Sequence, residues 1–386
     1  MQKKLEMIDR AKSLIPLIER EADNTEKNSR LSEKVIDQFC SAELPQLLVP
    51  KRFGGHEMDL ETFSQIIYEI APYCSSTAWV LAFYIGHNFI HALFPEKSQE
   101  EVFAEKSYAL TPGTIAPNFS LTSVDGGYIA NGRSQWNSGS SRCDWFLCSG
   151  LIKFDDRPPI AKVFLAPASE VTIIDNWNVA GMKGTASHDI EICDLFIPEH
   201  RVANTSDVLD GRSPGARIHD NPIYSTPLLP FTMGEVIPVI TGAYKGAAET
   251  FKRITENRAS AFNASKISAK QLAQMRIGQG IAGSNLAYDM MKSYVSDMSN
   301  SNTDQLRQIT SRAALKAKAA MIIDFCTSGI NDLMLGAGAS SFRNDSPMQR
   351  YFRDINMLRV HGLLDLDPAT ETYGRVLLGL NPELPL

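Results

Sequence analysis

The side chains best suited to proton transfer near neutral pH are seven histidines. His87 and His91 lie four residues apart in a stretch that reads as a helix, so we expect both side chains to point to the same side. No histidine stands in an H-E-x-x-H pattern or a similar arrangement of metal ligands. The spacing therefore favours acid–base or hydrogen-bonding roles for histidine and predicts no metal site.

The six cysteines are scattered, and none forms a C-x-x-C pair. This pattern is typical of reduced residues in a core, and it predicts neither disulfides nor a zinc site. The positions are Cys40, Cys74, Cys143, Cys148, Cys193 and Cys326.

Composition excludes several classes of function. The net charge of −6 leaves no basic excess to neutralise phosphates, which argues against a nucleic-acid partner. No apolar run approaches the roughly 18 residues that a membrane span needs. Charged residues interrupt the first 23 residues, unlike a signal peptide, so we expect a cytoplasmic protein without a membrane partner.

The chain divides by pattern into a helical part, a β-rich part and a second helical part, with expected domains at 1–107, 108–227 and 228–386. Apolar residues recur every three or four positions in the outer parts, in 4–22, 31–42, 60–94, 238–257, 269–297 and 303–329. The middle part holds short β-type runs, and Gly126–Gly127 and Asn131–Gly132 are predicted hairpin turns. A small antiparallel barrel or sandwich between helical domains is the expected α+β, mainly α, architecture.

One long motif identifies a family with this order of elements. Residues Trp177–Pro198 read WNVAGMKGTASHDIEICDLFIP. This stretch resembles the signature of the acyl-CoA dehydrogenase superfamily, in which W…GMRGTGS precedes a strand that ends in VP. The resemblance implies an N-terminal helical domain, a middle β domain and a C-terminal four-helix bundle.

The dehydrogenases of this superfamily use a carboxylate base, which in many of them follows an Arg-Asp pair by about eight residues. The matching stretch here supplies Arg353–Asp354, and the base position falls at 360–362, where the residues are Val, His and Gly. His361 is the titratable side chain at that place, although Asp365 and Asp367 lie a little beyond. The resemblance therefore favours chemistry other than dehydrogenation.

Three further stretches resemble the group D two-component flavin monooxygenases, which include hydroxyphenylacetate hydroxylase, steroid-ring phenol hydroxylases and dibenzothiophene monooxygenase. Residues 128–145 read YIANGRSQWNSGSSRCDW and resemble GGY…GxWxxxSG…W. Residues 78–94 read AWVLAFYIGHNFIHALF and are similar to the W…G.H…..F helix of the family. Residues 346–354 read SPMQRYFRD and resemble SPLQRxxRD.

This resemblance implies catalytic roles for three residues and a substrate site around a fourth and a fifth. Ser138 is expected beside flavin N5, with Ser140 as the alternative, and His361 near the distal oxygen of the flavin adduct. His87 is expected to contact the substrate. The positions expected to line the substrate pocket are His87, His91 and Phe83.

The same resemblance implies a set of cofactor-binding residues. Trp136 and Ser138 are expected beside the flavin ring, and the strand of Thr114 and Ala116 beside its pyrimidine. Arg258 and Arg343 are expected near the flavin phosphate, where an arginine fork suits phosphate geometry.

The expected reaction uses reduced FAD or FMN and O2, through a C4a-hydroperoxyflavin, to hydroxylate or epoxidise a small phenol- or indole-like substrate. No nicotinamide-binding G-x-G-x-x-G unit follows a strand, so a separate NAD(P)H:flavin reductase is the expected partner. The resemblance also implies a homotetramer. Three alternatives remain open: an acyl-CoA dehydrogenase or oxidase with a displaced base, an amine N-hydroxylase, and a flavin-binding protein without turnover.

Overall fold

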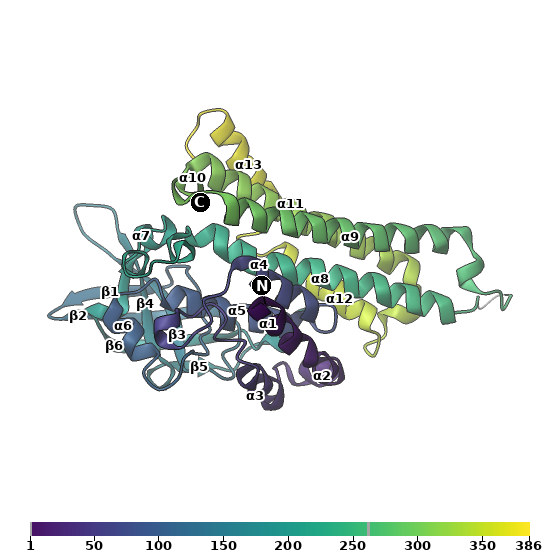
Figure 1. Ribbon diagram of the computed structural model, residues 1–386, viewed down its shortest axis with the longest axis horizontal. Helices are drawn as coiled ribbons and strands as arrows, with labels where there is room; N and C mark the ends of the chain where they lie inside the picture. Colours follow the sequence, from purple (N-terminus) through teal and green to yellow (C-terminus); the bar gives the residue numbers. More distant parts are fainter. Residues whose placement is uncertain (1, 261–262) are drawn as a thin grey trace.

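The computed structural model describes residues 2–260 and 263–386. Figure 1 shows a β-sheet at one end, short helices beside it, and three long helices, α8, α9 and α11, that run side by side away from it. The order along the chain is helices, sheet and helices, as the sequence predicts.

The described residues of the N-terminal part form six α-helices, and proline accounts for two of the breaks that the sequence did not predict. The predicted single helix over 4–22 is two helices, because Pro16 occupies the first turn of α2. Pro72 lies between α4 and α5, which divide the predicted stretch 60–94. The bounds are α1 Gln2–Ser13, α2 Ile15–Asn28, α3 Glu33–Ser41, α4 Leu60–Ile70, α5 Ser75–His91 and α6 Glu96–Val102.

The middle part folds as one seven-stranded sheet in the order β5-β6-β2-β1-β3-β4-β7. Neighbouring strands run antiparallel except β1 and β3, which pair in parallel through Phe119 and Ser120. An apolar core fills the interior of this part and includes Phe119, Phe146 and Phe164. The bounds are β1 Phe119–Val124, β2 Gly127–Asn137, β3 Trp145–Ile152, β4 Ile160–Pro167, β5 Thr172–Ile174, β6 His188–Pro198 and β7 Val202–Asn204.

One predicted turn is wrong. Gly126–Gly127 does join β1 to β2, but Asn131–Gly132 lies inside β2, where the register with β6 shifts between Ala130 and Gly132. Gly132 has φ 144°, a backbone region that glycine adopts without a steric penalty. At this shift Asn131 of β2 faces two residues of β6, Cys193 and Asp194, so the extra residue of the bulge belongs to β6. The asparagine–glycine pair therefore continues β2 opposite this bulge and does not form a turn.

The C-terminal part is built on α8 (Leu228–Asn257), α9 (Gln271–Asn300) and α11 (Ile309–Ala337), which pack along their lengths (Figure 1). Pro238 lies within α8, which begins ten residues before the predicted start at 238. The helices that complete this part are α10 (Thr303–Arg307), α12 (Pro347–Arg359) and α13 (Leu366–Leu377). The short helix α7 (Thr205–Leu209) belongs to the connection from the sheet.

Candidate functional site

Only one side chain of helix α5 is appreciably accessible to solvent. Every residue from Ser75 to His91 is buried except Phe83, which is partly exposed. Trp79, Phe83 and His87 follow one another at four-residue steps and therefore share a face of the helix. Their rings are in contact, with centroids 4.9 Å apart for Trp79 and Phe83 and 5.1 Å for Phe83 and His87. The accessible side of α5 is thus an aromatic row centred on Phe83.

The hydroxyl of Ser138 joins this row to the sheet. Ser138 Oγ accepts a hydrogen bond of 3.0 Å from Trp79 Nε1. It also lies 2.8 Å from Ser187 Oγ, which in turn lies 2.7 Å from Thr185 Oγ1. Ser138 is buried, so these partners fix its side chain. The structure therefore places an oriented hydroxyl group at the end of the aromatic row.

Residues 180–187 of the signature motif form a loop, which we call the signature loop. A backbone hydrogen bond joins this loop to the turn that carries Ser138. Gly139 N donates to the carbonyl of Thr185 at 2.7 Å, and Tyr84 Oη donates to the carbonyl of Gly139 at 2.9 Å. Gly139 has φ 87°, which favours glycine. Ser140, the alternative to Ser138, donates to the carbonyl of Ala186 at 2.8 Å and therefore has a structural partner already.

Arg353 and Asp354 hold the signature loop in place. Asp354 Oδ1 accepts a hydrogen bond of 2.6 Å from the backbone N–H of Met182, and the Arg353 guanidinium donates to the carbonyl of Ala180. A side chain at Gly181 would overlap the backbone of Arg353. Burial raises the pKa of Asp354 to about 7, partly offset by the hydrogen bond from Met182. The Arg-Asp pair thus positions the loop that holds Ser138.

His361 approaches the other side of Trp79. Its ring meets the indole edge-on, with centroids 5.9 Å apart. The backbone N–H of Leu363 donates to His361 Nδ1 at 3.4 Å, which leaves the ring proton on Nε2. Burial lowers the pKa of His361. The residue is therefore a neutral imidazole whose Nε2–H is a hydrogen-bond donor. Asp365 and Asp367, the other candidates for a base, are exposed at the start of α13.

His87 and His91 both bind Thr111. His87 Nδ1 lies 2.6 Å from the carbonyl of Thr111, and His91 Nε2 lies 2.7 Å from its hydroxyl. Because a carbonyl only accepts, His87 carries its proton on Nδ1, and its Nε2 is an acceptor. Burial lowers the pKa of His87 to about 4 and that of His91 to about 3. Both rings are neutral at physiological pH.

Trp136 stands exposed next to this cluster. Its side chain is 56% exposed, its φ is 69°, and its ring meets Trp177 edge-on at 5.3 Å. A bulky residue rarely adopts a positive φ, and such outliers gather at functional sites. An exposed aromatic ring two residues before the fixed hydroxyl of Ser138 suits a flavin ring, which has an apolar face and a polar N5 edge. These residues are compatible with the cofactor that the sequence predicts.

The remaining predicted flavin residues are less close together. Thr114 N donates to Leu147 O at 3.1 Å, and Ala116 N donates to Thr114 Oγ1 at 3.2 Å, so both amides have partners within the chain. Arg258 follows the C-terminal end of α8, which lies far from the sheet (Figure 1), and it donates to the carbonyl of Ala337. Arg343 is exposed and paired with Asp345. The structure does not bring either arginine to Ser138 within one chain.

Two residues that organise the site were missed in the sequence. Trp79 contacts Ser138, Phe83 and His361, yet a tryptophan on an apolar helix reads as ordinary core packing. Thr111 fixes two histidines but stands outside any motif. The four-residue spacing of Trp79, Phe83 and His87 was the available signal for the first of them.

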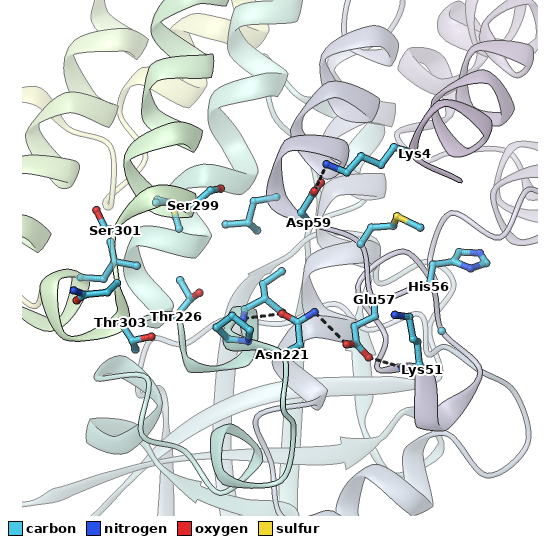
Figure 2. Close-up of a pocket in the computed structure, with 18 of the residues that line it drawn as sticks. Lys4, Lys51, His56, Glu57, Asp59, Asn221, Thr226, Ser299, Ser301 and Thr303 are labelled. Carbon is cyan, nitrogen blue, oxygen red and sulfur yellow. Dashed lines mark hydrogen bonds and ion pairs between the residues drawn. The ribbon is translucent and has the colours of Figure 1, made fainter. Parts of the chain in front are cut away.

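A separate pocket of about 920 Å³ opens between the start of α4, the 51–58 loop, the 221–226 segment and the α9–α10 junction (Figure 2). None of the predicted site residues lines it. Much of its charge is already paired: Lys4 binds Asp59, and Glu57 accepts from Asn221 Nδ2 at 3.1 Å and from Lys51 N at 2.8 Å. This pocket is not the site predicted from the sequence.

The described residues provide neither a metal-binding cluster nor a membrane-spanning helix. Within the described residues, no group of three or more His, Cys, Asp or Glu side chains is placed to hold a metal ion. Over the same residues, no helix has the length and apolar character required to span a bilayer. All six cysteines are free thiols.

Comparisons with known proteins agree with the fold. Residues 236–366 match the family described as acyl-CoA dehydrogenase, C-terminal domain. The chain is 39% identical to a pigment production hydroxylase of Rhodococcus sp. (strain ATCC 21145), over 99% of this chain and 98% of that protein. It is 30% identical to the oxygenase subunit HsaA, a flavin-dependent monooxygenase of Mycobacterium tuberculosis (strain ATCC 25618 / H37Rv), over 96% and 94% of the two chains.

A solved structure gives the same answer. The crystal structure of the 3-HSA hydroxylase from Rhodococcus sp. RHA1 superposes with a TM-score of 0.90 at 28% identity and covers 97% of both chains. The acyl-CoA dehydrogenase fold is therefore confirmed over the whole length. These matches place the chain in the family of flavin-dependent monooxygenase oxygenase components that share the acyl-CoA dehydrogenase fold.

Proposed function

We propose that this chain uses reduced flavin and O2 to hydroxylate a small, neutral, phenol- or indole-like aromatic compound. The observation that carries this proposal is that two neutral histidines, at the two ends of one aromatic row, have opposite hydrogen-bonding roles. His87 presents an acceptor nitrogen and His361 a donor N–H, with Phe83 and Trp79 between them. Reduced flavin, held beside Trp136 and Ser138, would supply the electrons that activate O2.

His87 is suited to bind a substrate O–H or N–H. Its Nδ1–H is held by the carbonyl of Thr111, so a ring hydroxyl or an indole N–H donates to Nε2. Accepting this proton in part raises the electron density of the aromatic ring, which favours attack on an electrophilic oxygen. Phe83, which stacks on His87 with an interplanar angle of 11°, offers the substrate ring an apolar surface.

Ser138 and His361 are suited to the oxygen-transfer end of the row. The Ser138 hydroxyl accepts from Trp79 and is oriented by Ser187, so its position is set before any ligand enters. The Nε2–H of His361 would donate a hydrogen bond to the distal oxygen, the one that is transferred to the substrate. Such preorganised donors cost no reorientation at the moment of reaction.

The family also bears on partners. Relatives named as oxygenase components or subunits, such as the p-hydroxyphenylacetate 3-hydroxylase of Acinetobacter baumannii, support a separate flavin reductase for this chain. We further propose a homotetramer, a domain division at 1–107, 108–227 and 228–386, and roles for Arg258 and Arg343 at the flavin of another subunit. The last point is supported by the distance of the α8 end from the sheet (Figure 1).

Turnover with defined components tests this proposal. The purified chain, an unrelated flavin reductase, NADH and FAD or FMN are incubated with phenol, resorcinol or indole. We expect hydroxylated product with at least one of these compounds and none with the acyl-CoA thioesters that dehydrogenases oxidise. Desaturation of an acyl-CoA without any hydroxylation would overturn the proposal.

A further inference from the structure

A buried acid on α8 has no role in the chemistry described so far. Glu235 is 1% exposed, and its Oε1 has no hydrogen-bond partner. Burial raises the pKa of Glu235 well above its ordinary value, which favours the protonated acid. A buried polar atom without a hydrogen-bond partner lowers the stability of the fold. A buried acid without a partner is therefore a candidate for binding a ligand.

The carboxyl group of Glu235 occupies a gap in α5. A Cβ at Gly86 would overlap Glu235 Oε1 and approach Cδ at 2.6 Å, so the acid fills the place where residue 86 would have a side chain. Trp79, Phe83 and Gly86 are spaced by four and three residues and lie along one stripe of the helix. The carboxyl group therefore continues the aromatic row beyond Phe83.

This placement puts the carboxyl group of Glu235 and the ring of His87 on either side of Phe83. Residues 86 and 87 lie at the same level of α5 and differ in direction by about 100°, since a turn takes 3.6 residues. Phe83 points between these two directions one turn earlier, and it is the residue of α5 that is not buried. An aromatic compound lying on Phe83 thus has an acceptor nitrogen on one side and an acid group on the other.

We propose that Glu235 is a specificity-determining residue that exchanges hydrogen bonds with a second neutral polar group of the substrate. The substrate class is an aromatic ring with two hydrogen-bonding substituents, one bound by His87 and the other by Glu235. The un-ionised acid offers one donor and one acceptor, which suits a hydroxyl, amide or N–H group. A carboxylate substituent is disfavoured, because it must lose its hydration beside an acid that offers no positive charge.

This inference rests on the proposed function, and its test separates the two. Phenol has a single hydroxyl group and no other polar substituent. Resorcinol adds a second hydroxyl group, and 4-hydroxyphenylacetate adds a carboxylate. We expect the wild type to favour resorcinol over both others in kcat/KM. Glu235→Leu should raise KM for resorcinol about tenfold, the effect of one neutral hydrogen bond, and leave kcat and the phenol reaction within about twofold. Glu235→Gln keeps a neutral donor and acceptor and should retain the preference.

Two controls guard against a purely structural effect. Glu249→Leu makes the same change at an exposed position of α8 and should leave all three substrates unaffected. Gly86→Ala introduces the Cβ that displaces the acid, and it should lower the resorcinol preference as Glu235→Leu does. Calorimetric titration of resorcinol into each folded variant with oxidised FAD gives a readout that does not depend on turnover.

The outcomes distinguish the two proposals. If the wild type hydroxylates phenols but Glu235→Leu and Gly86→Ala keep the resorcinol preference, the role of Glu235 is refuted and the proposed function stands. If the wild type hydroxylates none of the three, the proposed function fails. If the wild type desaturates an acyl-CoA and Glu235→Gln abolishes that reaction, the acid is a base for proton abstraction and both proposals are overturned.

Discussion

At the scale of single residues, the site depends on which proton each neutral side chain holds. The carbonyl of Thr111 fixes the proton of His87 on Nδ1, and the backbone N–H of Leu363 fixes that of His361 on Nε2. Ser138 is fixed by Trp79 and Ser187. Main-chain groups thus assign one acceptor and one donor to two chemically identical side chains.

Burial of His87 should make stability depend on acidity. Its pKa is about 4 in the folded protein and about 6.5 when unfolded, so between these values the unfolded state binds the additional proton. The stabilisation by neutral His87 is complete above pH 6.5 and is lost as pH falls towards 4. Wild type should lose about 2 kcal/mol more than His87→Gln between pH 7 and pH 5 in urea unfolding. Equal losses in the two proteins would contradict the assignment.

Removal of the Ser138 hydroxyl should uncouple O2 consumption from product formation. Ser138→Ala removes one hydrogen-bonding group beside the proposed flavin edge, so we expect roughly tenfold more hydrogen peroxide per product. Ser140→Ala is the matched control, because that hydroxyl already donates to Ala186. Peroxide and product are measured in the same reductase-coupled assay. Equal coupling in wild type and Ser138→Ala would remove Ser138 from the mechanism.

At the scale of elements, α5 and the signature loop form the site where they meet. Arg353 and Asp354, which supply the familiar pair before the base in related dehydrogenases, here hold the loop through Ala180 and Met182. Pro16 divides a helix that the sequence predicts as continuous, whereas Pro238 lies inside α8. Asn131–Gly132 continues β2 and forms no turn, because the pairing with β6, which local sequence does not reveal, extends across it. Trp79 is the tryptophan of the W…G.H…..F motif, but its role was not predicted because that role depends on Ser138, which is 59 residues away.

One tyrosine of α8 packs against both of the other long helices. The ring of Tyr244 on α8 lies against Gly283 of α9 and Gly329 of α11, and a Cβ at either glycine would overlap it. Gly329→Ala should therefore lower the free energy of unfolding by about 1–3 kcal/mol. Gly278→Ala meets nothing within 4 Å on α9 and should raise it by about 0.5–1 kcal/mol. Urea unfolding of both variants measures these changes. A Gly329→Ala variant with the same free energy of unfolding as the wild type would contradict this packing role of Tyr244.

At the scale of the whole molecule, the bundle presents apolar side chains that one chain leaves uncovered. Leu335 and Met321 on α11 are 75% and 60% exposed, and the others on α9 are Leu272, Met275 and Leu286. Such a surface is typical of a protein–protein interface. It supports the proposed tetramer, and the sequence alone indicated this assembly only through the family resemblance.

The proposed assembly can be broken at that surface. Leu335→Glu combined with Met321→Glu should shift the protein from tetramer to smaller species in sedimentation velocity, because a charged residue is costly in an apolar interface. Leu5→Glu, at a position of α1 that is 58% exposed, is the control and should leave the assembly unchanged. A wild type that sediments as a monomer at all concentrations would contradict the tetramer.

The central claim is that this chain transfers an oxygen atom from O2 to an aromatic ring. The most direct test is reductase-coupled turnover of resorcinol under ¹⁸O2, with mass spectrometry of the product. The account predicts one ¹⁸O atom in the product and no label when the isotope is supplied as water. Product without label from O2, or O2 reduced only to hydrogen peroxide with every aromatic compound offered, would contradict it.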